Sequence, residues 1–119
     1  MSLESYQELK VWQLGMTIAE QCYFLTKNYP KDELFGLTSQ IRRASARIPA
    51  NIAEGYGRGH RAEYRQFLRI SNGSLKELET HLLLSARVET TSPEVVAPIL
   101  GLCEEEGKML IALIRSLES

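Results

Sequence analysis

The sequence is poor in the residues that most often build metal and redox sites. Its 119 residues include two cysteines and two histidines. Cys22 and Cys103 lie far apart, and neither has a neighbour at ligand spacing, so we interpret both as small buried side chains. His60 and His81 also lack His, Cys or carboxylate partners at the spacing of a metal site. We therefore predict no bound metal and no cofactor.

Long apolar runs and a strong net charge are missing as well. No stretch approaches the ~18 apolar residues of a membrane-spanning helix, and the polar N-terminus does not resemble a signal peptide. We therefore expect no membrane partner and a cytoplasmic location. The net charge of −1 argues against strong, non-specific nucleic-acid binding by the chain as a whole. No nucleophile, acid–base pair or phosphate loop stands in a recognisable context, so we predict that the protein is not an enzyme.

The residues that are present predict one all-α domain. A hydrophobic content of 44% and a charged content of 24% are ordinary for a globular protein, and the length suffices for a single core. Apolar residues recur at helical spacing in four segments, at about residues 6–27, 37–56, 61–87 and 93–117. Asp32 or Thr38 is a possible cap of the second segment, and Ser92 is the expected cap of the fourth. The short connections favour an antiparallel up-down-up-down four-helix bundle.

Two apolar rows run along the first segment. One contains Leu9, Trp12, Met16, Ala19 and Tyr23, and the other contains Val11, Leu14, Ile18, Cys22 and Leu25. A surface helix needs only one apolar face. We therefore predict that one row faces the core and that the row from Val11 to Leu25 is a candidate interface with another subunit. The alternative is a helix that is buried centrally in its own subunit.

A polar stripe lies beside the apolar face of the second segment. Its members are Gln40, Arg43, Arg47, Asn51 and Glu54. Because a buried charge must be paired, our hypothesis is that Arg43 pairs with Glu54 or with Glu77 of the third segment. Gln40, Arg43, Asn51, Glu54 and Glu77 would then form a structural polar network that sets helix register or the subunit contact.

Three further features of the helical segments lead to expectations about packing. Pro49 removes a backbone donor inside the second segment and predicts a kink there. Gly73 in the third segment costs about 1 kcal/mol relative to Ala, which we attribute to close packing of a neighbouring helix. The acidic run Glu104–Glu106 is interpreted as a solvated face of the fourth segment.

Basic residues are concentrated in the middle of the chain. Residues 40–70 contain seven arginines but only two acidic residues, and Arg58, Arg61, Arg65 and Arg69 recur at helical spacing. This arginine stripe is a candidate nucleic-acid-binding surface that contacts phosphates, and an oligomer would multiply it. The alternatives are a solvated face, salt bridges to Glu63 and the fourth helix, or contact with an acidic protein partner.

Residues 36–44 (GLTSQIRRA) and 48–55 (IPANIAEG) resemble the signature of the four helix bundle protein family, also called the 23S rRNA intervening-sequence protein (S23) family. The flanking LKVWQ (9–13), FL (67–68) and GSLKELET (73–80) agree with it. The resemblance covers nearly the whole chain and implies an antiparallel four-helix bundle that assembles into a homopentamer, in a family largely of undefined function. A related branch, the accessory protein of diversity-generating retroelements, binds nucleic acid and a reverse transcriptase.

Together, the residues and the resemblance predict a non-enzymatic, oligomeric helical scaffold or interaction protein whose main partner is itself, as a homopentamer. The alternative function is an RNA- or DNA-binding accessory protein that uses the arginine stripe of Arg58, Arg61, Arg65 and Arg69.

Overall fold

The computed structural model describes residues 5–118, and these form four α-helices without any strand. The helices are α1 (Lys10–Thr26), α2 (Leu37–Gly57), α3 (Arg61–Arg87) and α4 (Pro93–Ser116). Two short 3-10 helices, η1 (Tyr6–Glu8) and η2 (Lys31–Glu33), precede α1 and α2. The prediction of an all-α protein is confirmed.

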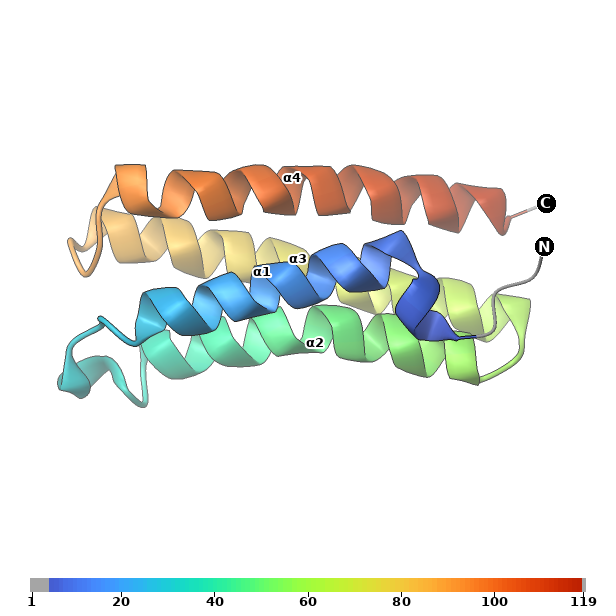
Figure 1. The fold of residues 1–119 in the computed structure, drawn as a ribbon, viewed down its shortest axis with the longest axis horizontal. Coiled ribbons are helices and arrows are strands. Elements are labelled where there is room, and N and C mark those ends of the chain that lie inside the picture. The colour runs from blue at the N-terminus through green and yellow to red at the C-terminus, as the bar shows by residue number, and fades with distance from the viewer. Residues whose placement is uncertain (1–4, 119) are drawn as a thin grey trace.

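The helices form an antiparallel bundle in which each helix packs against the next one along the chain (Figure 1). α4 lies beside α1 and closes the bundle, and η1 lies at the same end of it as the C-terminal end of α4. The molecule measures 45 × 21 × 21 Å. Its packing is closest between α2 and α3 and sparsest between α1 and α4. This is the expected up-down-up-down topology.

The predicted helix bounds hold closely, except at the beginning of the first helix. Ser5 accepts a hydrogen bond from the backbone N–H of Gln7, and Leu9 has an extended backbone, so η1 is separate and α1 begins at Lys10. At α2, neither Asp32 nor Thr38 acts as the cap, because the Leu37 N–H donates to Glu33 Oε1 at 3.0 Å. Ser92 does cap α4 as expected, accepting from the Val95 N–H.

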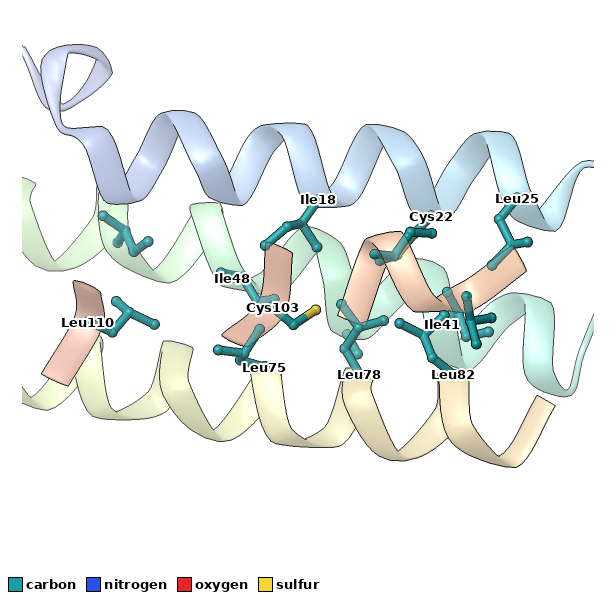
Figure 2. Close-up of a cluster of buried hydrophobic side chains, with 14 of the residues drawn as sticks. Ile18, Cys22, Leu25, Ile41, Ile48, Leu75, Leu78, Leu82, Cys103 and Leu110 are labelled. Atoms are coloured by element: carbon teal, nitrogen blue, oxygen red, sulfur yellow. The ribbon is translucent and has the colours of Figure 1, made fainter. Parts of the chain in front are cut away.

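The core is a continuous seam of aliphatic side chains and two cysteines along the bundle axis (Figure 2). The fully buried members include Ile18 and Cys22 of α1, Ile41, Ile48 and Ile52 of α2, Leu68, Leu75, Leu78 and Leu82 of α3, and Val96, Cys103 and Leu110 of α4. Burial of each large aliphatic side chain contributes roughly 1.5–3 kcal/mol of transfer free energy. All four helices contribute to this seam, so the helices must fold together.

Pro49 lies inside α2 without ending it, because the helix continues to Gly57. The Pro49 side chain is buried, and nearby the Ser71 hydroxyl of α3 donates to the Ile48 carbonyl of α2 at 2.9 Å. This buried hydrogen bond satisfies a polar group that would otherwise cost free energy in the core, and it ties α3 to the middle of α2.

The close approach of helices occurs at Gly55 and not at Gly73. A Cβ atom at Gly55 would lie 2.5 Å from Phe67 Cβ, whereas nothing lies within 4 Å of the same position at Gly73. The expectation that Gly73 allows close packing is therefore wrong, and α2 meets α3 at Gly55 because only glycine leaves room there.

These two glycines predict opposite effects of a single methyl group. We expect Gly55→Ala to lower the free energy of unfolding by about 1–3 kcal/mol, since the clash is with a Cβ atom that cannot rotate away. Gly73→Ala should raise it by about 0.5–1 kcal/mol through helix propensity. Urea denaturation of both variants, at one protein concentration, measures the pair. Destabilisation by both variants would show that Gly73 is also tightly packed.

Candidate functional site: the outer faces of the bundle

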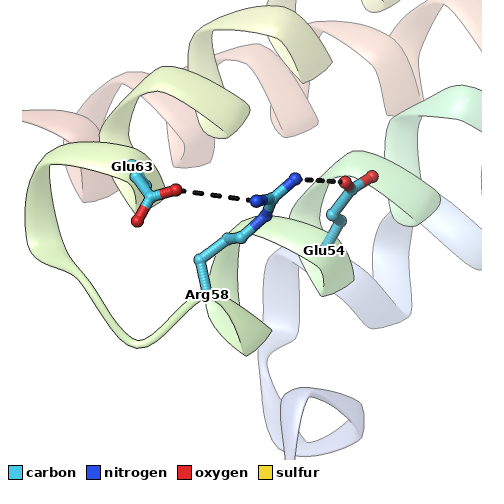
Figure 3. A network of polar contacts seen from close by, with 3 residues as sticks. All are labelled: Glu54, Arg58 and Glu63. Atoms are coloured by element: carbon cyan, nitrogen blue, oxygen red, sulfur yellow. Dashed lines mark hydrogen bonds and ion pairs between the residues drawn. The ribbon is translucent and has the colours of Figure 1, made fainter.

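The arginine stripe begins at the turn between α2 and α3, where Arg58 is engaged on two sides (Figure 3). Its guanidinium lies 3.0 Å from Glu54 and 3.7 Å from Glu63. The same group stacks over the Phe67 ring at 5.1 Å from the ring centroid. The side chains of this ion-pair network are about half exposed, so each pair contributes only ~0–1 kcal/mol.

Further along α3, two arginines of the stripe contact the residues that follow α4. Arg65 donates to the Leu117 carbonyl, just beyond α4, at 2.6 Å, and Arg69 lies 3.8 Å from Glu118. Arg61 lies at the exposed start of α3. An arginine at a helix C-terminus satisfies a carbonyl that has no partner in its own helix. Arg58, Arg65 and Arg69 therefore all make intramolecular contacts, as the salt-bridge interpretation expected.

The predicted polar network on α2 does not form within the chain. Gln40, Arg43 and Glu77 are exposed, and Glu54 pairs with Arg58 and not with Arg43. The Asn51 amide donates to the Arg47 carbonyl in its own helix. The hypothesis of an Arg43–carboxylate pair is wrong for the part of the chain that the structure describes, because this stripe lies on the outer face of α2.

Arg42, one position earlier, is the arginine that joins α2 to α1. Its Nε atom donates to Thr26 Oγ1 at 2.8 Å, and its guanidinium lies 4.8 Å from the centroid of the Tyr23 ring. Thr26 is buried and also donates to the Cys22 carbonyl. The helical repeat places Arg42 and Arg43 only 100° apart, so the sequence pattern alone could not separate them.

The row of α1 that was predicted to face another subunit lies instead in the core of its own chain. Val11, Ile18, Cys22 and Leu25 of the candidate interface row are buried in the core of their own chain, and Leu14 is partly buried. The prediction that this row faces another subunit is therefore wrong. It fails because the spacing shows two rows but not which of them meets α2, α3 and α4.

The other row of α1 opens onto an apolar groove between α1 and α2. This α1/α2 groove is lined by Met16, Ala19, Glu20, Tyr23, Phe24, Ala46 and Pro49. Met16, Tyr23 and Phe24 are exposed, Phe24 to 57%. Phe35, in the connection to α2, is 93% exposed and lies beside the same edge with Tyr23 and Ala46. Apolar side chains thus extend across both helices on the outside of the bundle.

A second apolar patch lies on the C-terminal half of α3. This α3 patch comprises Leu83 and Leu84, which are exposed, with Thr80 and Arg87 beside them. Val88, at the end of the helix, is also exposed. The patch belongs to a different helix from the α1/α2 groove, so these two apolar surfaces are separate.

Glu106 of α4 is fully buried, although its neighbours Glu104 and Glu105 are exposed. Neither carboxyl oxygen has a hydrogen-bond partner among the described residues. Burial, with a smaller contribution from the charge of Glu105, raises the pKa of Glu106 from 4.5 to about 8. The expectation of a solvated Glu104–Glu106 face is wrong for Glu106. The signal was its spacing of three from Cys103 and four to Leu110, which places it in the buried row.

The other buried titratable groups offer no reactive centre. Burial raises the pKa of both Cys22 and Cys103 to about 12, so these thiols are neutral at physiological pH. His81 Nδ1 is buried without a partner. Over residues 5–118, no group of three or more His, Cys, Asp or Glu side chains is arranged to hold a metal ion. None of the helices in that range is both long and apolar enough to cross a membrane.

Comparison with known proteins agrees with this geometry. The sequence model of the family described as 23S rRNA-intervening sequence protein matches residues 7–112. The chain belongs to this family. A crystal structure of a protein of unknown function from the S23 ribosomal protein family of Bacteroides thetaiotaomicron is similar over 87% of this chain and 97% of its own. The two have a TM-score of 0.81 and 28% sequence identity.

The comparison with curated proteins finds no match. Membership of the 23S rRNA-intervening sequence protein family therefore establishes the relationship and the bundle, and the related structure is itself one of unknown function. It indicates no catalytic family.

The arginine contacts give a test of whether the stripe is structural. We expect Arg65→Ala to lower the free energy of unfolding by about 1.5 kcal/mol. The substitution removes a partly buried hydrogen bond from a charged guanidinium to the Leu117 carbonyl at the end of α4. Arg69→Ala, which removes a longer and half-exposed pair, should cost less than about 0.5 kcal/mol. Thermal or urea unfolding compares the two. Equal effects would show that the Leu117 contact does not hold the end of α4.

Proposed function

We propose that the protein is a non-enzymatic, cytoplasmic scaffold or interaction protein that works as a homopentamer. The single observation that carries this proposal is the exposed α1/α2 groove. Monomeric proteins rarely leave several large apolar side chains together at the surface, and Met16, Tyr23 and Phe24 lie together in this groove. A second copy of the chain would remove them from water.

The presence of two apolar surfaces favours a ring over a two-fold dimer. A two-fold dimer uses one self-complementary surface, whereas a head-to-tail contact joins two different surfaces and can close into a ring. The α1/α2 groove and the α3 patch lie on different helices, so one subunit can offer the groove while the next offers the patch. The number five comes from the family resemblance.

Small side chains support helix-to-helix contact at the groove. Ala46 and Ala50 are exposed on α2, and Ala53 is partly exposed one turn further. An alanine stripe lets a helix from another subunit approach closely without displacing long side chains. Its outer neighbours Arg43 and Arg47 would then lie at the edge of the contact, where a charged residue stays hydrated.

Nucleic-acid binding through the arginine stripe has weaker support. Arg58, Arg65 and Arg69 already contact acidic side chains or a carbonyl, so phosphates would have to displace these partners. The net charge of −1 also adds no long-range attraction for a polyanion.

Light scattering on the wild type and two surface variants tests the assembly. We expect a wild-type mass of about five chains. Phe24→Glu in the groove and Leu84→Glu in the α3 patch should each abolish the ring, because a charge that is buried at an interface is left unpaired. An equimolar mixture of the two variants should form a dimer, since each one keeps the surface that the other lacks.

Ala112→Glu is the matched control, because Ala112 is exposed on α4 near Lys108 and Glu105, away from both apolar surfaces. It should keep the wild-type mass. A monomeric wild-type protein at both low and high salt would contradict the proposal. Dissociation by Phe24→Glu alone, with Leu84→Glu unchanged, would instead support a contact through the groove only.

A further inference from the structure

Glu106 has the surroundings of a group that must be neutral to stay where it is. Its Oε2 atom lies 3.1 Å from the position that a Cβ atom of Gly15 would occupy. Ile48 and Pro49 side-chain carbons lie 3.4 and 3.5 Å from the same point. The carboxyl group therefore fills a niche that the missing side chain of Gly15 leaves, at the junction of α1, α2 and α4.

Within residues 5–118, the buried residues of α1, α2 and α3 that surround this niche carry no charge. Cys22 is the one titratable member of the buried row of α1. On α3, Lys76 approaches α4 at Gly107, where its Nζ atom lies 3.8 Å from the position of an added Cβ atom, and it pairs with Glu79 at 3.2 Å. On α4 itself, the titratable neighbours are Cys103 and Glu105. An ionised Glu106 would thus be an uncompensated charge in the core.

Because the niche lies between α4 and α1, ionisation of Glu106 would disturb the contact between these two helices. Glu106 belongs to α4 and contacts the Gly15 position of α1, and this is the helix pair with the sparsest packing. Rotation of α4, or its movement away from α1, would bring the carboxylate to water, because Glu104 and Glu105 beside it on the same helix are already exposed. The tight contact of α2 with α3 at Gly55 and Phe67 need not change.

We propose that Glu106 is a proton-controlled latch between α4 and α1, which packs α4 into the bundle while its carboxyl group is neutral and loosens it when the group ionises. The closed bundle is then the protonated form. The open form exposes part of the apolar seam that α4 covers, including the surroundings of Cys103.

The sign of the pH dependence follows from the direction of the pKa shift. The pKa of Glu106 is about 8 in the bundle and close to its ordinary value of 4.5 in the unfolded chain. Between these values the folded chain holds one proton that the unfolded chain has lost. The contribution of Glu106 to stability is therefore fully present below pH 4.5 and is lost as the pH rises towards 8. One proton corresponds to a roughly tenfold rise in the unfolding equilibrium constant per pH unit.

The test compares Glu106→Gln with wild type and with Glu105→Gln in urea denaturation from pH 5 to 9, at one protein concentration. Gln has the shape of the neutral acid but cannot ionise. We expect wild type and Glu105→Gln to share the pH-dependent slope and Glu106→Gln to lack the one-proton part of it. Equal slopes for Glu106→Gln and wild type would overturn the proposal.

Hydrogen exchange at pH 8.5 locates the effect. Wild type and Glu106→Gln are measured at the same pH, so the intrinsic exchange rates cancel in the comparison. We expect amide exchange in α1 and α4 to be faster in wild type than in Glu106→Gln, and exchange in α2 and α3 to be the same in both. Uniform change across all four helices would overturn the latch. If Glu106→Gln does not fold, carbon NMR of the wild-type carboxyl decides: titration near pH 8 supports the proposal, and titration near pH 4.5 overturns it.

Discussion

The structure depends on the burial of one apolar row from each of the four helices in a common core. Within this core, the packing is closest between α2 and α3. Phe67 of α3 lies so close to Gly55 of α2 that no side chain fits at Gly55. The two helices therefore cannot approach each other more closely at this point. The Ser71 hydroxyl then reaches the Ile48 carbonyl. With α2 and α3 held in this way, the remaining apolar rows of α1 and α4 can be buried only in the groove that this pair forms.

The same constraint decides which side chains face outwards. Once Ile41, Ile48 and Ile52 point into the seam, Arg43 and Gln40 of α2 must lie on its outer face. The row of Met16 and Tyr23 is likewise left outside on α1 when Ile18 and Cys22 are buried. The charged groups at the end of the bundle find partners near them, Arg58 with Glu54 and Glu63 among them, whereas Phe24 of α1 and Leu84 of α3 stay exposed.

A carboxyl group among buried, uncharged side chains costs stability at high pH, because desolvation opposes its ionisation. Glu106 is accommodated by Gly15, which offers space but no hydrogen-bond donor for the carboxylate oxygens. A neutral residue of similar volume would fill this space without any dependence on protons. The packing of α4 therefore depends on the protonation of Glu106, whereas the packing of the aliphatic core does not depend on pH.

The sequence by itself determined the all-α class, the four helices, most of their ends and the family, because the 3.6-residue period, Ser92 and Pro93, and the GLTSQIRRA and IPANIAEG segments are local signals. Only the tertiary structure decided which row of α1 is buried, which arginine joins α2 to α1 and which glycine is a contact point. These choices depend on the rotation of each helix about its own axis. Residues 100° apart differ little in a periodic pattern, and that rotation is set by side chains distant in sequence, such as Phe67 against Gly55.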